Sequence, residues 1–360
     1  LALVREARRS GTGDFIDLSI QAYVASVLEV AIPAYSYTGN VVTRLHQRSL
    51  IPWRIFQAKD RPIFIVCVEQ DQWERLVEFM GTPDWTTLDV FADQQNRAEN
   101  QDLVHTFVQE FVSDWIADDL YHAAQKHRVC VAPVLSLGEI SGNEHLRARN
   151  FFTQVERGAG ESVQHMASAV LGTQGRADIA RPAPTLGEHN PDLGTLPARE
   201  PAQASTSPTL PLDGVRVLDL TWAWAGPFAT LNLAHLGAQV IRIESEKRAD
   251  LYRRFSVCPE GVEQTLNTSG MFNQWNQGKS SITIDLGSSE GVQLVRELVK
   301  HSDVVVQNFA TGVIDRLGLG YEALRSINPG IILASISGYG QSGPYREYMG
   351  YGPAIPPLTG

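Results

Sequence analysis

The second half of the chain alternates short apolar runs with helical segments, and this alternation limits the possible folds most strongly. The runs "VRVLDL", "AQVIRIE", "SSITIDL", "DVVVQNF" and "GIILASIS" have the length of buried strands. A segment with helical spacing between the first two, "GPFATLNLAHLG" (226–237), has proline near its start and glycine at its end. Strands that alternate with helices predict a doubly wound, parallel α/β sheet of the Rossmann-like type.

The first half has a different pattern. "RPIFIVCV" (61–68) and "RVCVAPVLS" (128–136) are expected to be strands, and the segments 69–81 and 101–127 are expected to be amphipathic helices. The segment "GDFIDLSIQAYVASVLEVAIPAYSY" (13–37) predicts a short strand followed by one long helix. Together these elements predict a smaller α+β domain with helical connectors.

A stretch from about 180 to 214 separates the halves and is dense in Pro, Ser, Thr and Gly. Such a composition is typical of an extended linker. We therefore expect three parts: a first domain over 1–190, a linker over 191–213 and the parallel-sheet domain over 214–360.

Charge and composition exclude several classes of function. The net charge of −10 argues against a nucleic-acid partner, which normally requires a basic patch. No apolar run approaches the ~20 residues that span a membrane, so no membrane association is expected. Three scattered cysteines indicate a reducing compartment, and we expect a cytoplasmic protein. The histidines show no metal-ligand spacing, so no metal site is predicted.

The stretch "SISGYGQSGP" (335–344) fits the dinucleotide pattern G-x-G-x-x-G at Gly338, Gly340 and Gly343. That fingerprint opens a helix and is followed by an acidic residue about 20 positions later. Here Pro344 follows at once and no such strand and acid appear. The loop is therefore expected to be either a structural bend or a glycine-rich contact to another ligand. A nicotinamide oxidoreductase remains an alternative that depends on this pattern alone.

Ligands of a parallel sheet bind beyond the carboxyl ends of its strands. In this chain those positions are Thr221 to Ala225, Asn308 and Ser337 to Gln341. The sequence has no G-x-S-x-G elbow and no phosphate-binding Walker loop. Residue patterns alone thus predict a ligand-binding α/β domain and a small second domain, without a catalytic pair.

Three longer stretches carry a family resemblance: "PLDGVRVLDLTWAWAGPFATLNLAHLGAQVIRIE", "NQGKSSITIDLGSSEG" and "DVVVQNFATGVIDRLGLGYEALRSINPGIILASISGYGQSGPY". They resemble, in order, the N-terminal domain of the family III CoA-transferases (CaiB/BaiF), which include formyl-CoA and carnitine CoA-transferases and α-methylacyl-CoA racemases. The stretches "RVCVAPVLSLGEISGNEHLRARNFF" and "RPAPTLGEHN" of the first half are similar to the C-terminal portion of the same family. The resemblance thus implies that the C-terminal portion of one copy is joined to the N-terminal portion of a second copy, as in a fragment of a tandem two-copy protein.

The resemblance implies transfer of CoA between carboxylic acids through an aspartyl mixed anhydride and an aspartyl-CoA thioester. A carboxylate suits this chemistry as both nucleophile and leaving group. The family aspartate falls outside this chain, so no catalytic residue is named, and Asp219, Asp285, Asp303 and Asp315 are interpreted as structural. Tyr351 and Gly352 stand where racemases have a histidine and an aspartate, which argues against racemase chemistry. A non-catalytic acyl-CoA-binding half is the alternative.

The resemblance also implies binding residues and partners. The implied CoA-binding residues are Trp224, Ala225, Asn308, Arg316 and Tyr339, and the loop near the thioester contains Gly338, Gly340 and Gln341. Basic residues that the family can carry are replaced here by Ser245, Gly287 and Ser337. The expected partners are acyl-CoA and a carboxylic acid acceptor, with no permanently bound cofactor. Family members form interlocked homodimers, and a tandem protein would achieve the same pairing within one chain.

Overall fold

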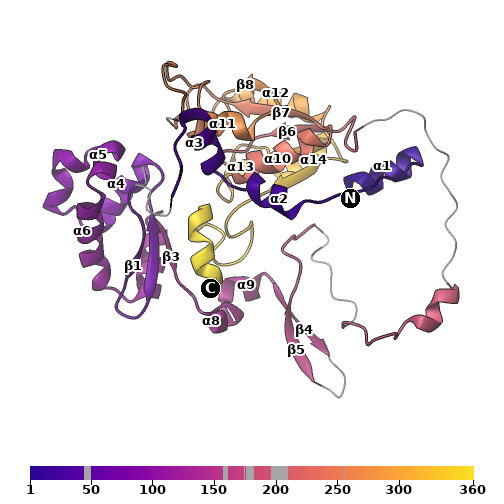
Figure 1. Ribbon diagram of the computed structural model, residues 1–360, viewed down its shortest axis with the longest axis horizontal. Coiled ribbons are helices and arrows are strands. Elements are labelled where there is room, and N and C mark those ends of the chain that lie inside the picture. The colour runs from indigo at the N-terminus through magenta and orange to yellow at the C-terminus, as the bar shows by residue number, and fades with distance from the viewer. Residues whose placement is uncertain (44–49, 157–160, 174, 176–181, 196–209, 256) are drawn as a thin grey trace. The chain divides into compact units, whose positions relative to one another are not determined.

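The computed structural model describes residues 1–43, 50–156, 161–173, 175, 182–195, 210–255 and 257–360 (Figure 1). The chain divides into two compact units. One contains Leu1–His46 and Glu200–Ser337, and the other contains Gln47–Arg199 and Gly338–Gly360. We call them the parallel-sheet unit and the antiparallel-sheet unit. In the described ranges, no helix combines the length and the apolar character needed to cross a bilayer.

The parallel-sheet unit contains a five-stranded sheet in the order β10-β9-β6-β7-β8, and every neighbouring pair is parallel. The strands are β6 (Arg216–Asp219), β7 (Gln239–Glu244), β8 (Ser280–Thr283), β9 (Val304–Gln307) and β10 (Ile332–Ser335). This sheet confirms the predicted α/β class. The chain builds outward from β6 first on one side and then on the other, so the topological switch point lies between β6 and β9.

Helices connect these strands. They are α10 (Ala225–His235), α11 (Gly270–Trp275), α12 (Ser289–Val299), α13 (Val313–Arg316) and α14 (Tyr321–Ile327), and α1 (Ala2–Ser10) lies near the N-terminus. Of these, α10 covers most of the segment 226–237 for which the sequence predicts a helix. Gly237 follows α10 with φ +99°, a left-handed conformation in which a Cβ would lie 2.4 Å from Leu210 Cβ. The glycine stop predicted for this helix is thus explained by its backbone. Buried side chains of the strands, Leu218 and Val305 among them, pack with Val295 and Val299 of α12.

The segment 13–37 differs from the prediction. It contains no strand among residues 14–19, and two short helices, α2 (Ile20–Ser26) and α3 (Ala31–Thr38), replace the single long helix. Ser19 starts α2 by accepting a hydrogen bond from the Ala22 amide. Pro33 has no N–H and is tolerated in the first turn of α3, whereas the middle of one continuous helix would lose a backbone hydrogen bond there.

The antiparallel-sheet unit contains a three-stranded antiparallel sheet in the order β1-β2-β3. Its strands are β1 (Trp53–Gln57), β2 (Pro62–Val66) and β3 (Cys130–Pro133), and its longer helices are α4 (Gln70–Phe79), α6 (Gln101–Ser113) and α7 (Ala117–Lys126). The shorter elements are α5 (Gln94–Glu99), α8 (Leu137–Gly142), α9 (Glu144–Ala148) and the hairpin of β4 (Phe152–Glu156) and β5 (Ser162–Met166). The sequence analysis did not anticipate β1, β4 or β5. All five residues of β5 are exposed, so it has no apolar alternation to detect.

Candidate ligand-binding site

The loop after β6 lies at the switch point and is tied to the end of β9. The Trp222 amide donates to Asn308 Oδ1 at 2.8 Å, and Asn308 Nδ2 donates to the Trp222 carbonyl at 2.8 Å. The side-chain amide of Asn308 therefore forms hydrogen bonds with both the N–H and the carbonyl of Trp222. This pair joins the two strand ends where a parallel sheet normally binds its ligand.

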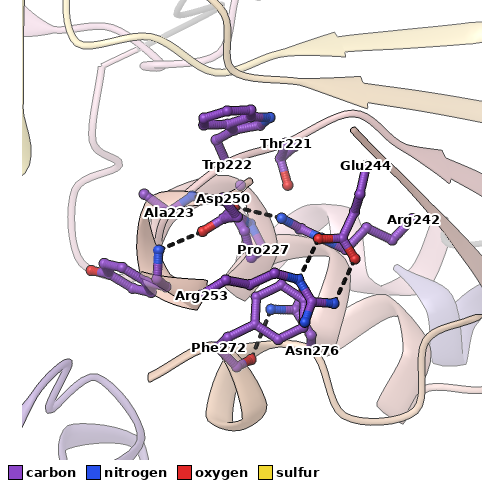
Figure 2. Close-up of polar contacts among 12 residues, drawn as sticks. Thr221, Trp222, Ala223, Pro227, Arg242, Glu244, Asp250, Arg253, Phe272 and Asn276 are labelled. Carbon is purple, nitrogen blue, oxygen red and sulfur yellow. Dashed lines mark hydrogen bonds and ion pairs between the residues drawn. The ribbon is translucent and has the colours of Figure 1, made fainter. Parts of the chain in front are cut away.

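A second anchor holds the next residue of this loop (Figure 2). Ala223 adopts φ +59°, an uncommon conformation for a residue with a side chain, and its amide donates to Asp250 Oδ2 at 3.1 Å. Asp250 also accepts hydrogen bonds from Arg242 Nη2 at 2.6 Å and from the Tyr252 amide at 2.7 Å. The contacts of Asp250 thus stabilise the turn that leads from β6 into α10.

Buried charges beneath the loop form one compensated network. Arg242, on β7, is 1% exposed and lies 3.8 Å from Asp219 Oδ2 and 3.7 Å from Glu244 Oε2. Glu244 also accepts two hydrogen bonds from the Arg253 guanidinium, at 2.7 and 2.8 Å, and Arg253 lies over the Phe272 ring (Figure 2). Because each buried carboxylate has a cationic partner, the network supports the loop without a net buried charge.

Asp219, at the end of β6, is buried, and both of its carboxylate oxygens accept hydrogen bonds from other residues of the chain. Its carboxylate accepts hydrogen bonds from Thr221, from Thr230 Oγ1 at 2.7 Å and from Lys279 Nζ at 3.0 Å. Burial alone would raise the pKa of Asp219, but Lys279 and Arg242 hold that pKa below its usual range. Burial lowers the pKa of Lys279 to about 8. These contacts agree with the structural role that the sequence analysis gave to Asp219.

Trp224 and Ala225 begin α10. The Trp224 indole lies edge-on to Trp275, with ring centroids 6.1 Å apart, and packs beside Phe228. Its Nε1 is buried and has no hydrogen-bond partner within the described residues. Ala225 is exposed, and Gly226 lies so close to Thr221 that a Cβ on the glycine would be 2.3 Å from Thr221 Cβ. The small residues here let the helix start directly against the strand end.

Two arginines near this edge leave their guanidinium groups accessible. Arg316, the last residue of α13, is exposed, and its guanidinium forms no hydrogen bond or ion pair within the described parts of the chain. The guanidinium of Arg248, which is also exposed, lies 5.1 Å above the Trp222 ring. Sequence reasoning missed Arg248, although it stands three positions after Ser245, where a basic residue was expected. Both cations are suited to contact an anionic ligand.

The glycine-rich loop belongs to the other unit. The Tyr339 side chain is 9% exposed, packs in the core of the antiparallel-sheet unit and accepts a hydrogen bond from the Tyr121 hydroxyl at 3.0 Å. Gly340 has φ +79°, and a Cβ there would lie 2.5 Å from Arg149 Cζ. Gly343 has φ +90°, and a Cβ there would lie 2.8 Å from the His145 ring.

Gly338 and Gln341 are the other predicted positions of this loop. Gly338 lies against the backbone of Gly350, where a Cβ would be 3.0 Å from Gly350 Cα, and Gln341 is half-buried. Two of the three glycines that fit the dinucleotide pattern therefore have left-handed backbones beneath His145 and Arg149. No helix begins directly after Gly343, as the sequence predicted, and the next helical turn is the 3-10 turn Gly352–Ala354. Of the predicted residues, Trp224, Ala225, Asn308 and Arg316 lie on the parallel-sheet unit, whereas Gly338, Tyr339, Gly340 and Gln341 lie on the antiparallel-sheet unit.

Together, these features define a parallel α/β protein in which a loop tied between the ends of β6 and β9 lies beside the exposed guanidinium of Arg248. The model of one protein family, described as CoA-transferase family III, matches residues 1–190 and 212–360. The chain belongs to this family, which confirms the resemblance found in the sequence.

Two curated relatives and one solved structure are similar to this chain. A probable CoA-transferase of Mycobacterium tuberculosis is 28% identical over 98% of this chain and 44% of its own length. Human succinyl-CoA:glutarate CoA-transferase is 41% identical over 42% of this chain and 33% of its own length. A crystal structure of a CaiB/BaiF family protein from Brucella suis is 43% identical, with a TM-score of 0.36 over 39% of this chain and 37% of that one. The chain thus spans about a third to less than half of the length of the curated relatives it matches.

Proposed function

We propose that this chain is part of a CoA-transferase that moves CoA between two carboxylic acids. Membership of CoA-transferase family III supports this proposal, and relatives named as succinyl-CoA-dependent CoA-transferases point to dicarboxylic acids as the substrate class. The observation that carries the proposal is the edge between β6 and β9. There the Trp222–Asn308 pair fixes a loop beside the exposed guanidinium of Arg248.

In this proposal the edge binds CoA through its backbone and its cations. The rigid turn at Ala223 and the start of α10 at Trp224 and Ala225 offer a close approach to the CoA chain. Arg316 and Arg248 are candidates for its phosphates, since a guanidinium donates paired hydrogen bonds to phosphate oxygens. Tyr339 and the loop around Gly340 are proposed to border the thioester.

The proposed chemistry uses an aspartate of the same protein outside residues 1–360. Its carboxylate attacks the thioester carbonyl, the C–S bond breaks, and the products are a mixed anhydride and the CoA thiolate. The thiolate then attacks the aspartyl carbonyl and releases the first acid, which leaves an aspartyl-CoA thioester. The acceptor carboxylate attacks this thioester, which releases the CoA thiolate and forms a second mixed anhydride between the aspartate and the acceptor. The thiolate then attacks the acceptor's acyl carbonyl in this anhydride. The new acyl-CoA leaves and the aspartate is regenerated.

We also propose the tandem organisation, with a first copy ending near 190, a linker over 191–213 and a second copy starting at 214. The interruption of the family match between 190 and 212 supports this division. Residues 196–209 of the proposed linker lie outside the described part of the chain. The partner arrangement proposed with it is an interlocked homodimer or an intramolecular pairing of copies. Unpaired thiols at Cys67, Cys130 and Cys258 support a reducing, cytoplasmic location.

The test is a transfer assay with the protein encoded by the full gene. That protein is incubated with succinyl-CoA and a panel of carboxylic acids, and new acyl-CoA products are identified by mass spectrometry. The proposal expects a new acyl-CoA and a trapped enzyme–CoA thioester. Binding of CoA without transfer or adduct would instead support a non-catalytic acyl-CoA-binding half, and an absence of both binding and transfer would contradict the proposed function.

A further inference from the structure

The glycine-rich loop of the antiparallel-sheet unit is held by two side chains near α9. Arg149 Nη1 donates to the Ser342 carbonyl at 3.1 Å and to Ser342 Oγ at 2.7 Å. His145, 4% exposed, bridges the loop on either side of that serine. Because Gly340 and Gly343 lack side chains, the loop backbone lies directly against the guanidinium and the imidazole.

The contacts of His145 fix its protonation state. The Tyr345 amide donates to His145 Nδ1 at 3.0 Å, so Nδ1 must carry a lone pair. His145 Nε2 lies 2.7 Å from the Tyr339 carbonyl, which can only accept, so Nε2 must carry the proton. The imidazole is therefore the neutral Nε2–H tautomer, and its ring stacks on Tyr345 with an interplanar angle of 6°.

A proton added to Nδ1 has no acceptor in this arrangement. Two N–H groups would then face each other at the His145–Tyr345 contact, and one of them must move. We propose that His145 is a positioning residue that holds the loop 339–345 only while its imidazole is neutral, and that protonation releases the loop. Any effect of this release on catalysis rests on the proposed function, in which Tyr339 and the loop around Gly340 border the thioester.

The surroundings of His145 favour the neutral form. Burial lowers the pKa of His145 below its ordinary value of 6.5, and the charge of Arg149 acts in the same direction, whereas the Tyr339 carbonyl and Glu144 oppose them. The other titratable groups that face the ring are Tyr339 and Tyr345 of the loop, and His122 of α7 lies behind Tyr345. Because the folded-state pKa is lowered, the stabilising contribution is complete above the unfolded-state pKa near 6.5 and decreases as the pH falls below it.

The experiment measures amide hydrogen exchange of the segment 338–346 in the full chain between pH 8 and pH 5, as protection factors relative to intrinsic rates. The variant His145→Gln retains an amide acceptor and donor without a titrating group. The control is His165→Gln, an exposed histidine on β5 of the same unit. We expect the wild type and His165→Gln to lose protection progressively below pH 6.5. In His145→Gln the protection should not change with pH.

Two results would overturn the proposal: a pH-independent protection factor in the wild type, or the same pH dependence in His145→Gln. If that variant does not fold, nitrogen-15 spectra of the wild-type histidines decide the question, because a proton on Nδ1 at pH 7.5 contradicts the assigned tautomer. CoA affinity is measured in parallel. If the loop 339–345 loses protection at low pH but the protein does not bind CoA, the proposed function is refuted. The positioning role of His145 would still stand in that case.

Discussion

Substitution of Gly343 by alanine tests the contact between the glycine-rich loop and His145. The new Cβ would lie 2.8 Å from His145 Cε1 and Nδ1 and 3.1 Å from Arg149 Cγ, so the imidazole must shift. The left-handed backbone of this position, φ +90°, costs an alanine about 1–2 kcal/mol. Displacement of the imidazole removes its hydrogen bonds to Tyr339 and Tyr345, each of which contributes about 1 kcal/mol or more when the group left behind is buried. The expected loss is about 3–5 kcal/mol in the free energy of unfolding.

The matched control is Gly81→Ala in the same unit. Gly81 has φ +84°, but no atom lies within 4 Å of the position of its Cβ. This variant should therefore lose only the backbone contribution of about 1–2 kcal/mol. Both free energies are measured by urea unfolding, followed by circular dichroism and tryptophan fluorescence. If Gly343→Ala costs no more than Gly81→Ala, the loop does not lie against His145 and the reasoning fails.

Three further variants test the parallel-sheet unit. Asn308→Leu removes both hydrogen bonds to Trp222 and should lower the free energy of unfolding by about 2–4 kcal/mol, measured by urea titration; an unchanged midpoint would contradict the anchoring role. Arg242→Met leaves the buried carboxylate of Asp250 without its cation and should cost about 3–5 kcal/mol in the same assay. A neutral effect would refute the compensated network. Arg316→Gln should weaken CoA binding in calorimetric titrations while the melting temperature stays unchanged. The control is Arg325→Gln, which changes another exposed arginine, on α14. Equal CoA affinities of the two variants would remove Arg316 from the proposed site.

The sequence predicted the parallel sheet well because its central strands β6, β7 and β9 are largely buried. Val217, Leu218 and Val305 lie in strands with little exposed surface, so their apolar runs are continuous. The segment 13–37 was predicted wrongly because its apolar residues are largely exposed, Phe15 at 89% and Leu18 at 75%. Composition there suggested one long helix, whereas local capping by Ser19 and the position of Pro33 determine two.

The candidate site was only partly accessible to sequence reasoning. The position of Asn308 after a strand predicted that it lies at the carboxyl edge of the sheet. Its pairing with the Trp222 peptide depends on the order of strands, which apolar runs alone do not give. The sequence correctly predicted that no helix begins directly after Gly343, as one would in a dinucleotide loop. The reason for the glycines was hidden, because His145 and Arg149 lie almost 200 residues away in sequence.

The most direct test of the account is thermal unfolding of the full chain with CoA and with NADH in parallel. A ligand at 100 times its dissociation constant stabilises the folded state by about 2.7 kcal/mol, which a melting curve resolves. The account predicts that CoA raises the melting temperature and that NADH does not. Stabilisation by NADH without stabilisation by CoA would contradict the central claim and would restore the dinucleotide interpretation of the glycine pattern.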